Sequence, residues 1–267
     1  MSVKNEKGSS HRKKIGVIGS MGTVGRVVKH VFSYFYPDVV GYDIKGEGSW
    51  RDILDCDILF ICVPTPEKGG RLDCSIIEKI LNDLAGIFNG IVVIKSTVKV
   101  GFMDEMQEKF PELRLVYMPE FLREKSAFQW FVNPDRIVIA GEKKNIEKVL
   151  EIFTWLEGDI PILVMDFKAA EIAKLAHNAF IAVKVSFTNE IEMICRKFNV
   201  NPEDVMRVIW EDRRIKNSAH LRPGIGPYGG KCVPKDTKEL INAYGNSILI
   251  KAAEIVNEKF KAQGGVE

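Results

Sequence analysis

The sequence predicts an α/β protein in which a doubly wound parallel sheet is followed by an all-helical central domain. Between residues 14 and 156, short apolar runs alternate with amphipathic helical patterns, as in the repeated β–α units of a parallel sheet with helices on both faces. From about residue 166, apolar residues recur at helical spacing only. We therefore expect a flexible polar tail over 1–12, a first domain over 13–165 and a helical domain over 166–267.

The composition is that of an ordinary globular protein. Of the 267 residues, 46% are hydrophobic and 28% are charged, and the formal net charge is +2, so no strong field attracts nucleic acid or a membrane surface. The apolar runs are too short to span a bilayer, and the N-terminus lacks the apolar core of a signal peptide. The five cysteines, at 56, 62, 74, 195 and 232, lack metal-ligand spacing, which favours reduced thiols and no metal. We expect a cytoplasmic protein with no nucleic-acid or membrane partner.

The first strand and helix carry a phosphate-binding pattern. A strand at 14–18 leads into Gly19, Gly22 and Gly25, and an apolar helical pattern follows through Phe32. Glycines in such a turn let the backbone approach a pyrophosphate, which lies at the positive end of the helix. The first two glycines are one residue further apart than in the usual fingerprint. The alternative is a turn that only packs the helix on the strand.

The second strand, 39–43, ends in an acidic residue that supports the dinucleotide interpretation. Asp43 follows the glycine turn by roughly 20 residues, the distance expected of a carboxylate that binds ribose hydroxyls. Because Asp43 repels a 2′-phosphate, the pattern predicts a Rossmann-type domain that binds NAD rather than NADP. Lys45 is an objection to this preference.

The strand and helix alternation continues to about residue 156. Strands are expected at 57–63, 91–95, 115–118 and 136–140, and helices at about 75–87 and 144–156. Pro64 and Pro66 end the pairing of the third strand. Because ligands bind at the carboxyl edge of an open parallel sheet, we expect the ligand site at these strand exits.

The helical domain begins with one long amphipathic helix that ends near Phe198. Its apolar residues recur at steps of one, three and four. A helix on the order of 45 Å long is too long for a small domain to cover, so we expect a partner helix from a second subunit in a homodimer. Further helices are expected from Asn201 to about Glu211 and from Lys235 toward Lys261.

Cys232 lies in a loop rich in glycine and proline, 222–236, beside Lys231, Lys235 and Asp236. Such a loop lets a substrate approach the backbone closely, and nearby cations or a helix start favour the nucleophilic thiolate. The alternative is a small, buried, apolar cysteine.

Two pairs of polar residues have helical spacing. Lys174 and Asn178 lie at i and i+4, away from the apolar stripe of the long helix, and Glu120 and Glu124 have the same spacing. Solvated surface positions are the alternative for both pairs.

Eight blocks of the chain together resemble the UDP-glucose/GDP-mannose dehydrogenase family. The blocks are residues 19–25 with Asp43, 60–66, 95–98, 119–124, 133–137, 176–180, 186–190 and 229–236. The resemblance covers about residues 14 to 260. It implies a twofold NAD-dependent oxidation of a sugar C6 alcohol to a carboxylate, without release of the aldehyde.

The resemblance implies a role for each residue that matches. Cys232 resembles the nucleophile that traps the aldehyde as a thiohemiacetal, from which a second hydride leaves to give a thioester. Lys174 matches the lysine that stabilises developing oxyanion charge, with Asn178 beside it. Glu120 matches the base for thioester hydrolysis, and Thr97 and Asp236 match the groups that position water.

The remaining matches concern cofactor and substrate. Arg214 resembles an arginine that reaches the sugar of the neighbouring subunit, and Glu124 resembles a second carboxylate of the site. The expected cofactor-binding residues are Gly19, Gly22, Thr23, Val24, Asp43, Val63, Pro64, Thr65, Thr97, Glu124 and Lys235. The expected contacts to a nucleotide-sugar substrate are Glu124, Lys174, Arg214, Tyr228 and Gly229.

The chain also departs from the family. Lys231 precedes the nucleophile where a small or aromatic residue is common, and Lys216 stands in place of a glycine. Family members continue into a third, nucleotide-binding domain, whereas this sequence ends at Glu267. Either the chain is whole and uses a smaller or differently held substrate, or it is a shortened form.

Three functions therefore stay open. The first is a nucleotide-sugar dehydrogenase, which a separate chain could complete. The second is a single-step dehydrogenase of a smaller hydroxy acid or sugar acid, whose chemistry leaves a nucleophilic cysteine unexplained. The third is a non-catalytic NAD-binding dimer, which leaves the set of catalytic residues unexplained.

Overall fold

The computed structural model describes residues 13–122, 124–156, 158–216, 226–230 and 233–262. It falls into two compact units, Met1–His177 and Asn178–Glu267. The predicted domain boundary, 165/166, lies at the start of a long helix, whereas the boundary between the compact units lies inside that helix. The assignment of the two domains stays a prediction.

The first unit is built on a seven-stranded sheet in the order β2-β1-β3-β6-β7-β8-β9. The strands are β1 (Ile15–Ile18), β2 (Val39–Tyr42), β3 (Ile58–Ile61), β6 (Ile91–Ile94), β7 (Arg114–Tyr117), β8 (Ile137–Gly141) and β9 (Ile162–Met165). A separate hairpin pairs β4 (Glu67–Lys68) with β5 (Arg71–Leu72). The predicted doubly wound α/β fold is confirmed.

The sheet departs from the expected all-parallel pairing at one place. β8 runs antiparallel to β7, while the other strand pairs of this sheet are parallel. The prediction of a parallel β8 was wrong because a short buried run such as Ile137–Gly141 shows that a strand is covered on both faces, but not which way it runs.

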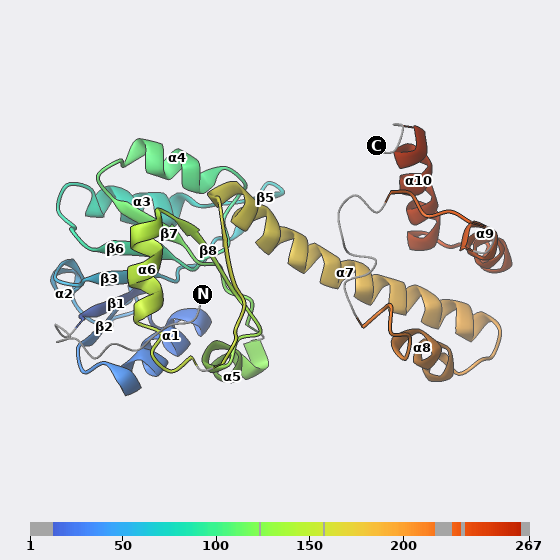
Figure 1. The fold of residues 1–267 in the computed structure, drawn as a ribbon, viewed down its shortest axis with the longest axis horizontal. Coiled ribbons are helices and arrows are strands. Elements are labelled where there is room, and N and C mark those ends of the chain that lie inside the picture. The colour runs from blue at the N-terminus through green and yellow to red at the C-terminus, as the bar shows by residue number, and fades with distance from the viewer. Residues whose placement is uncertain (1–12, 123, 157, 217–225, 231–232, 263–267) are drawn as a thin grey trace. The chain divides into compact units, whose positions relative to one another are not determined.

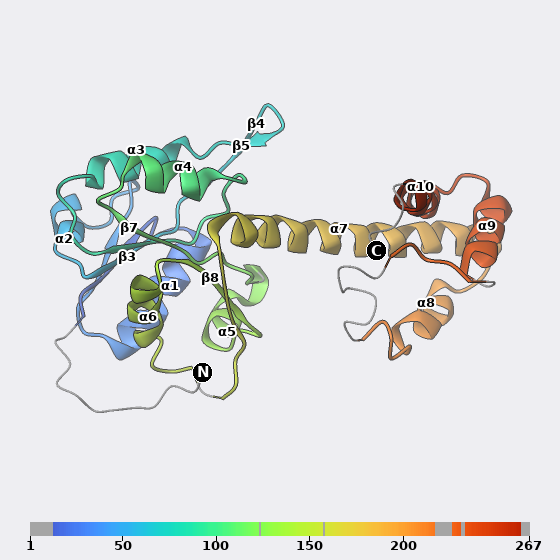
Figure 2. The ribbon, with the colours of Figure 1, turned by 45° about the horizontal axis from the view of Figure 1, so that its top comes forward.

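Helices cover both faces of the sheet (Figures 1 and 2). One face packs on α2 (Trp50–Leu54), α3 (Ser75–Leu84) and α4 (Phe102–Lys109), and the other packs on α1 (Thr23–Phe35), α5 (Ala127–Val132) and α6 (Lys143–Glu151). Side chains of successive strand residues point to opposite faces. In β3, Leu59 and Ile61 therefore join the first core, and Ile58 and Phe60 join the second.

The strand order fixes where a ligand crevice forms. β1 lies between β2 and β3, so the chain adds a strand first to one side of β1 and then to the other. The carboxyl ends of β1 and β3 meet at this switch point, where open α/β sheets bind ligands.

The second unit is helical. It contains the later part of α7 (Phe167–Lys197), followed by α8 (Pro202–Trp210), α9 (Val233–Tyr244) and α10 (Leu249–Ala262). Its small core joins Ile191, Ile194 and Cys195 of α7 to Ile250 of α10. The predicted long helix is confirmed. In the described ranges, no helix is both long enough and apolar enough to cross a membrane.

The last expected helix is wrong in one respect, because it is two helices. Gly245 lies between α9 and α10 with φ +78°, and its N–H donates to the carbonyl of Ile241 at 2.8 Å. A residue in this left-handed conformation ends a helix. The chain restarts at α10, whose first N–H groups donate to the buried carboxylate of Glu190, including Leu249 N–H at 2.8 Å.

Several short elements escaped prediction. They are α2, α4, α5, β9, the β4–β5 hairpin and a 3-10 turn, η1 (Glu124–Ser126). Each is too short or too polar to show a clear hydrophobic period.

Candidate functional site

The glycine turn after β1 is shaped by close contact between backbones. Gly19 has φ +81°, and a Cβ added to it would lie 2.6 Å from the carbonyl oxygen of Cys62, at the exit of β3. A Cβ on Gly25 would lie 2.1 Å from the carbonyl oxygen of Gly19. Gly22 is the N-cap of α1 and donates its N–H to the Gly19 carbonyl at 3.0 Å. The start of α1 therefore lies directly against the switch point, with no side chain between them.

Asp43 places a carboxylate beside this turn. It follows β2, and its two oxygens accept from the N–H groups of Met21 and Lys45, each at 3.0 Å. These contacts tie the β2 exit to the glycine turn. Four lone-pair sites on a carboxylate leave acceptor capacity for ribose hydroxyls.

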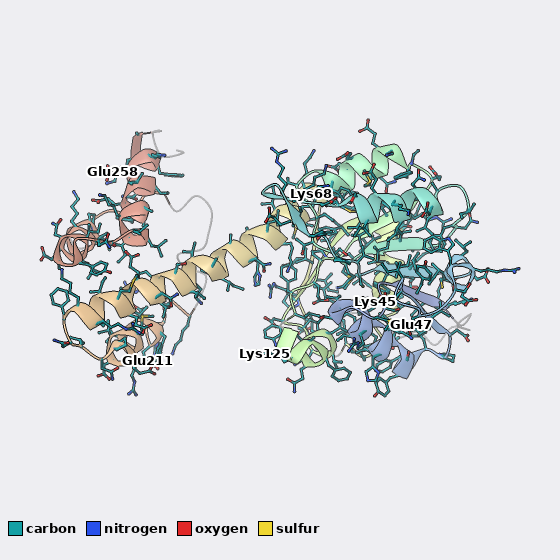
Figure 3. The ribbon with its side chains drawn as sticks, turned by 180° about the vertical axis from the view of Figure 1, so that it is seen from behind. Lys45, Glu47, Lys68, Lys125, Glu211 and Glu258 are labelled. Carbon is teal, nitrogen blue, oxygen red and sulfur yellow. The ribbon has the colours of Figure 1, made fainter. Side chains whose placement is uncertain are left out.

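A second acid in the same loop is already engaged. Glu47 accepts from the Lys29 ammonium of α1 and from the Ser20 hydroxyl, and these hydrogen bonds, that of Lys29 first, lower the pKa of Glu47. Lys45 and Glu47 are labelled in Figure 3. Sequence reasoning considered only Lys45 and missed this cluster.

The exits of β3 and β6 are joined by hydroxyl groups. Thr65 donates its hydroxyl to the Thr97 carbonyl at 2.7 Å, and Ser96 donates to the Val63 carbonyl at 2.6 Å. The Val63 backbone lies next to Gly19, while Pro64 is exposed. Predicted cofactor residues from three separate segments are thus adjacent.

The geometry fits a dinucleotide. At Gly19 and Gly25 a Cβ would overlap backbone oxygens of the chain itself, so these glycines let the start of α1, where a pyrophosphate would lie, pack closely against the turn. Thr23 and Val24 form the first turn of α1, where unpaired N–H groups attract phosphate. Asp43 supplies the acceptor expected for ribose.

A second cluster of polar side chains lies at the same carboxyl edge of the sheet. Lys95 follows β6 and Glu120 follows β7, and they form an ion pair of 2.8 Å with side chains only 2% and 15% exposed. The other oxygen of Glu120 accepts from the N–H groups of Phe121 and Leu122 at 2.9 and 3.1 Å. Three donors therefore fix this carboxylate.

The Phe121 ring connects Glu120 to further cations. Arg136 lies 4.5 Å and the Lys174 ammonium 5.0 Å from the ring centroid, within the range of cation–π attraction. The His177 ring packs edge-on at 5.1 Å. The start of α7 is thereby joined to the segment that carries Glu120.

Lys174 is buried rather than solvated, at 9% exposure. Burial is the main cause that lowers its pKa; Glu120 opposes this effect, and Lys95 and Arg136 add to it. The surface alternative for Lys174 and Glu120 was wrong because side chains from other segments cover both. Asn178, one turn later in α7, is exposed.

The other predicted site residues either lie in the helical unit or fall outside the residues that the structure describes. In the helical unit, Arg214 forms a two-pronged contact with Asp212, with Nη2 2.6 Å from Oδ2. The Tyr228 hydroxyl is buried without a hydrogen-bond partner among the described residues, and Gly229 is exposed. The following lie outside the description: Cys232 and Lys231 entirely, and the side chains of Glu124, Lys235 and Asp236.

Sequence reasoning missed Lys95 and Arg136 as members of this cluster. The signal for Lys95 was a lone lysine directly after a run of four apolar residues, Ile91–Ile94, at the sheet edge where ligands bind. Arg136, which precedes β8, was marked only by its place in the family-like block 133–137.

Two parts of the chain match models of one protein family. Residues 45–156 match the NAD binding domain of the UDP-glucose/GDP-mannose dehydrogenase family, and residues 168–259 match its central domain. Together the matches take in more than half of the chain. The prediction of NAD as the cofactor is confirmed by the first match.

Individual relatives agree with this assignment. A UDP-glucose 6-dehydrogenase of Campylobacter jejuni is 37% identical over 213 residues, which are 77% of this chain and 53% of the relative. The YwqF UDP-glucose 6-dehydrogenase of Bacillus subtilis is 38% identical over 207 residues, 73% of this chain and 46% of the relative. The chain spans about half the length of the curated relatives it matches.

A solved structure supports the same conclusion. The ternary complex of a GDP-mannose dehydrogenase from Pseudomonas aeruginosa superposes with a TM-score of 0.82 at 26% identity, covering 92% of this chain and 69% of that one. The family matches, the named relatives and the shared fold all point to one family. This chain belongs to the UDP-glucose/GDP-mannose dehydrogenase family.

Proposed function

We propose that the chain acts in the NAD-dependent oxidation of a nucleotide sugar, in which the sugar C6 alcohol is oxidised twice to a carboxylate. One observation carries the proposal: the Glu120 carboxylate and the buried Lys174 ammonium lie in one cluster, at the carboxyl edge that also holds the glycine turn. A base and a cation are the groups that such a reaction needs. The family and the printed activities of the relatives support the same chemistry.

In the proposed reaction, Cys232 is the nucleophile that forms the covalent intermediates with the substrate. The turn from Gly19 to Gly25 and Asp43 would hold NAD, which would supply the hydride acceptor for each oxidation. The first oxidation removes a hydride from C6 and releases the hydroxyl proton to give an aldehyde, and the Cys232 thiolate then bonds to the aldehyde carbon to form the oxyanion of a thiohemiacetal. Loss of a second hydride leaves a thioester. Water then adds to the thioester carbon, the carbon–sulfur bond breaks, and a carboxylate and the thiol result.

The cluster of Lys174 and Glu120 acts on the charges and protons that change during the reaction. The Lys174 ammonium stabilises the oxyanion that forms at each addition, because a cation in a poorly solvated position interacts strongly with new charge. Asn178 and the side chains of Thr97 and Asp236 assist by positioning the oxygen and the water. Glu120 accepts the proton of the attacking water.

Substrate contacts are proposed on the family pattern alone. Glu124 would serve as a second carboxylate toward both cofactor and sugar, and Lys235 would contact the cofactor. Arg214, Tyr228 and Gly229 would contact the nucleotide sugar.

The first test is the number of NADH molecules formed per sugar consumed, measured by absorbance with UDP-glucose and with GDP-mannose. We expect two. One NADH per sugar would favour a single-step dehydrogenase. If the chain binds NAD but forms no NADH, the proposal that this chain catalyses the reaction by itself is contradicted. Cys232→Ser should bind NAD as the wild type does yet form no carboxylate, so loss of NAD binding in this variant would contradict the role of Cys232.

A further inference from the structure

Lys95 is a lysine where lysine is rarely found. It directly follows β6, its N–H donates to the Ile61 carbonyl at 2.9 Å, and its side chain is 2% exposed. A buried ammonium without a partner is costly, so a lysine at such depth is expected to be paired. Its partner is the Oε2 atom of Glu120 at 2.8 Å, and its Nζ lies 5.6 Å from the Phe131 ring centroid.

Counting only donors from the described residues, the pairing leaves Glu120 one open acceptor site. A carboxylate has about four lone-pair sites. Two N–H groups, of Phe121 and Leu122, occupy Oε1, and Lys95 occupies one site on Oε2. The remaining site, on Oε2, has its direction fixed by these three donors, which is the arrangement that proton transfer to one defined atom requires.

The pairing also divides the charges of the cluster. Three cations surround the Phe121 ring and the Glu120 carboxylate: Lys95, Lys174 and Arg136. Arg136 has its own ion pair with Asp135 at 3.3 Å. With Lys95 bound to Glu120, the acid whose charge acts on Lys174 is paired with another cation.

We propose that Lys95 is a positioning residue of the reaction: it occupies Glu120 and repels Lys174, and so leaves the Lys174 ammonium available to a substrate oxygen. This role rests on the proposed function for its kinetic consequence. The effect of Lys95 on the charge of Lys174 can be measured by titration, without any turnover of substrate.

The direct test is a titration of Lys174 in the full chain by NMR, with lysines labelled at ¹³Cε and the Lys174 signal assigned by its loss in Lys174→Arg. The charged groups that act on Lys174 are Glu120, Lys95 and Arg136, and the His177 ring packs on Phe121, the ring that Lys174 also contacts. In Lys95→Met, Glu120 loses its partner and Lys174 loses a repelling charge. Both changes favour the ammonium, so we expect its titration midpoint to move to higher pH.

Three further variants serve as controls for this titration. Lys95→Arg keeps the cation and should leave the midpoint close to that of the wild type. Lys99→Met removes an exposed lysine that pairs with Glu105 at 3.0 Å, and should also leave it unchanged. If Lys95→Met does not fold, Lys95→Gln, which keeps a hydrogen-bond donor for Glu120 but no charge, should show the same upward shift. An unchanged or lowered midpoint in the folded uncharged variant would overturn the proposal.

The kinetic test uses the same variants with a nucleotide sugar and NAD. We expect Lys95→Met to lower kcat by roughly 10²-fold, the scale of acid–base assistance, with KM within about threefold. Lys95→Arg should recover at least a tenth of the wild-type kcat. An equal fall in both charged and uncharged variants would reduce Lys95 to a structural role. If the wild type forms no NADH, the proposed function fails. The titration still shows whether Lys95 lowers the titration midpoint of Lys174.

Discussion

At the scale of single residues, the chain places charged groups where strands end. Lys95, Glu120 and Asp43 each lie at or just after the carboxyl end of a strand. Each is held by hydrogen bonds or an ion pair to a neighbouring segment. Because strands place their ends accurately, a polar residue at such a position is held in a defined place without loss of the apolar strand behind it.

Asp43 gives the first prediction at this scale. Replacement by Ala removes the expected acceptor for ribose hydroxyls, so NAD binding should weaken by about 1–3 kcal/mol, measured by isothermal titration calorimetry. Asp55→Ala removes the same charge from a side chain that is 75% exposed and should leave the affinity unchanged. Equal affinity in wild type and Asp43→Ala would mean that the ribose is bound elsewhere.

At the scale of elements, the start of α1 depends on a position that has no room for a side chain. Gly25 belongs to the first turn of α1, and its missing Cβ is the space that keeps the helix against Gly19. The helix start can therefore face a ligand only while this position stays glycine.

Gly25→Ala should both destabilise the protein and reduce NAD binding. The added Cβ would lie 2.1 Å from a backbone oxygen, so α1 has to move away from the turn, at a cost of about 1–3 kcal/mol. Gly22→Ala is the matched comparison, because its Cβ would lie 3.3 Å from the same oxygen and should cost less. The check is urea unfolding together with NAD titration; equal effects of both substitutions would contradict this account.

The junction of α7 with α4 gives a prediction on pH. Glu171 of α7 is fully buried, and its two oxygens accept from the N–H groups of Gly101 and Met103, at 2.5 and 2.7 Å, at the start of α4. Burial raises the pKa of Glu171, and these hydrogen bonds oppose the rise. In the folded state the carboxyl group therefore keeps its proton to higher pH than in the unfolded chain.

This raised pKa sets the sign of the pH dependence. Between the ordinary glutamate pKa and the raised one, the folded state binds more protons, so the free energy of unfolding contributed by Glu171 falls as pH rises. Glu171→Gln does not titrate and leaves one N–H without its acceptor, which should cost about 1–3 kcal/mol. The difference in free energy of unfolding between wild type and Glu171→Gln should therefore narrow as the pH rises above the ordinary glutamate pKa. Urea unfolding at a series of pH values checks this, and a difference that widens with pH would contradict it.

At the scale of the whole molecule, the sequence predicted the sheet well and the buried cluster poorly. Runs such as Ile58–Ile61 predict a buried strand because all four residues are apolar. The direction of β8 and the burial of Lys174 depend on contacts between distant segments. A lysine off the apolar stripe of its helix looks solvated until Phe121 covers it, so family resemblance rather than periodicity pointed to Lys174. The break between α9 and α10 is marked in the sequence only by Gly245, and a lone glycine is also tolerated inside a continuous helix.

The exposed apolar side chains of α7 lead to the last prediction. Phe180, Ile181 and Val185 are 44%, 47% and 54% exposed on a helix of 31 residues, and apolar side chains gathered on one helix are a common feature of subunit interfaces. We therefore expect a homodimer in which α7 packs against its copy.

Sedimentation velocity at micromolar concentration should show twice the monomer mass for the wild type. Ile181→Glu places a charge in the expected interface and should raise the dimer Kd at least about 100-fold, or roughly 2.7 kcal/mol. Val208→Glu is the control, since Val208 lies on α8 and is 77% exposed; it should leave the dimer intact. A monomeric wild type would contradict the prediction. Dissociation by Val208→Glu but not by Ile181→Glu would move the interface from α7 to α8.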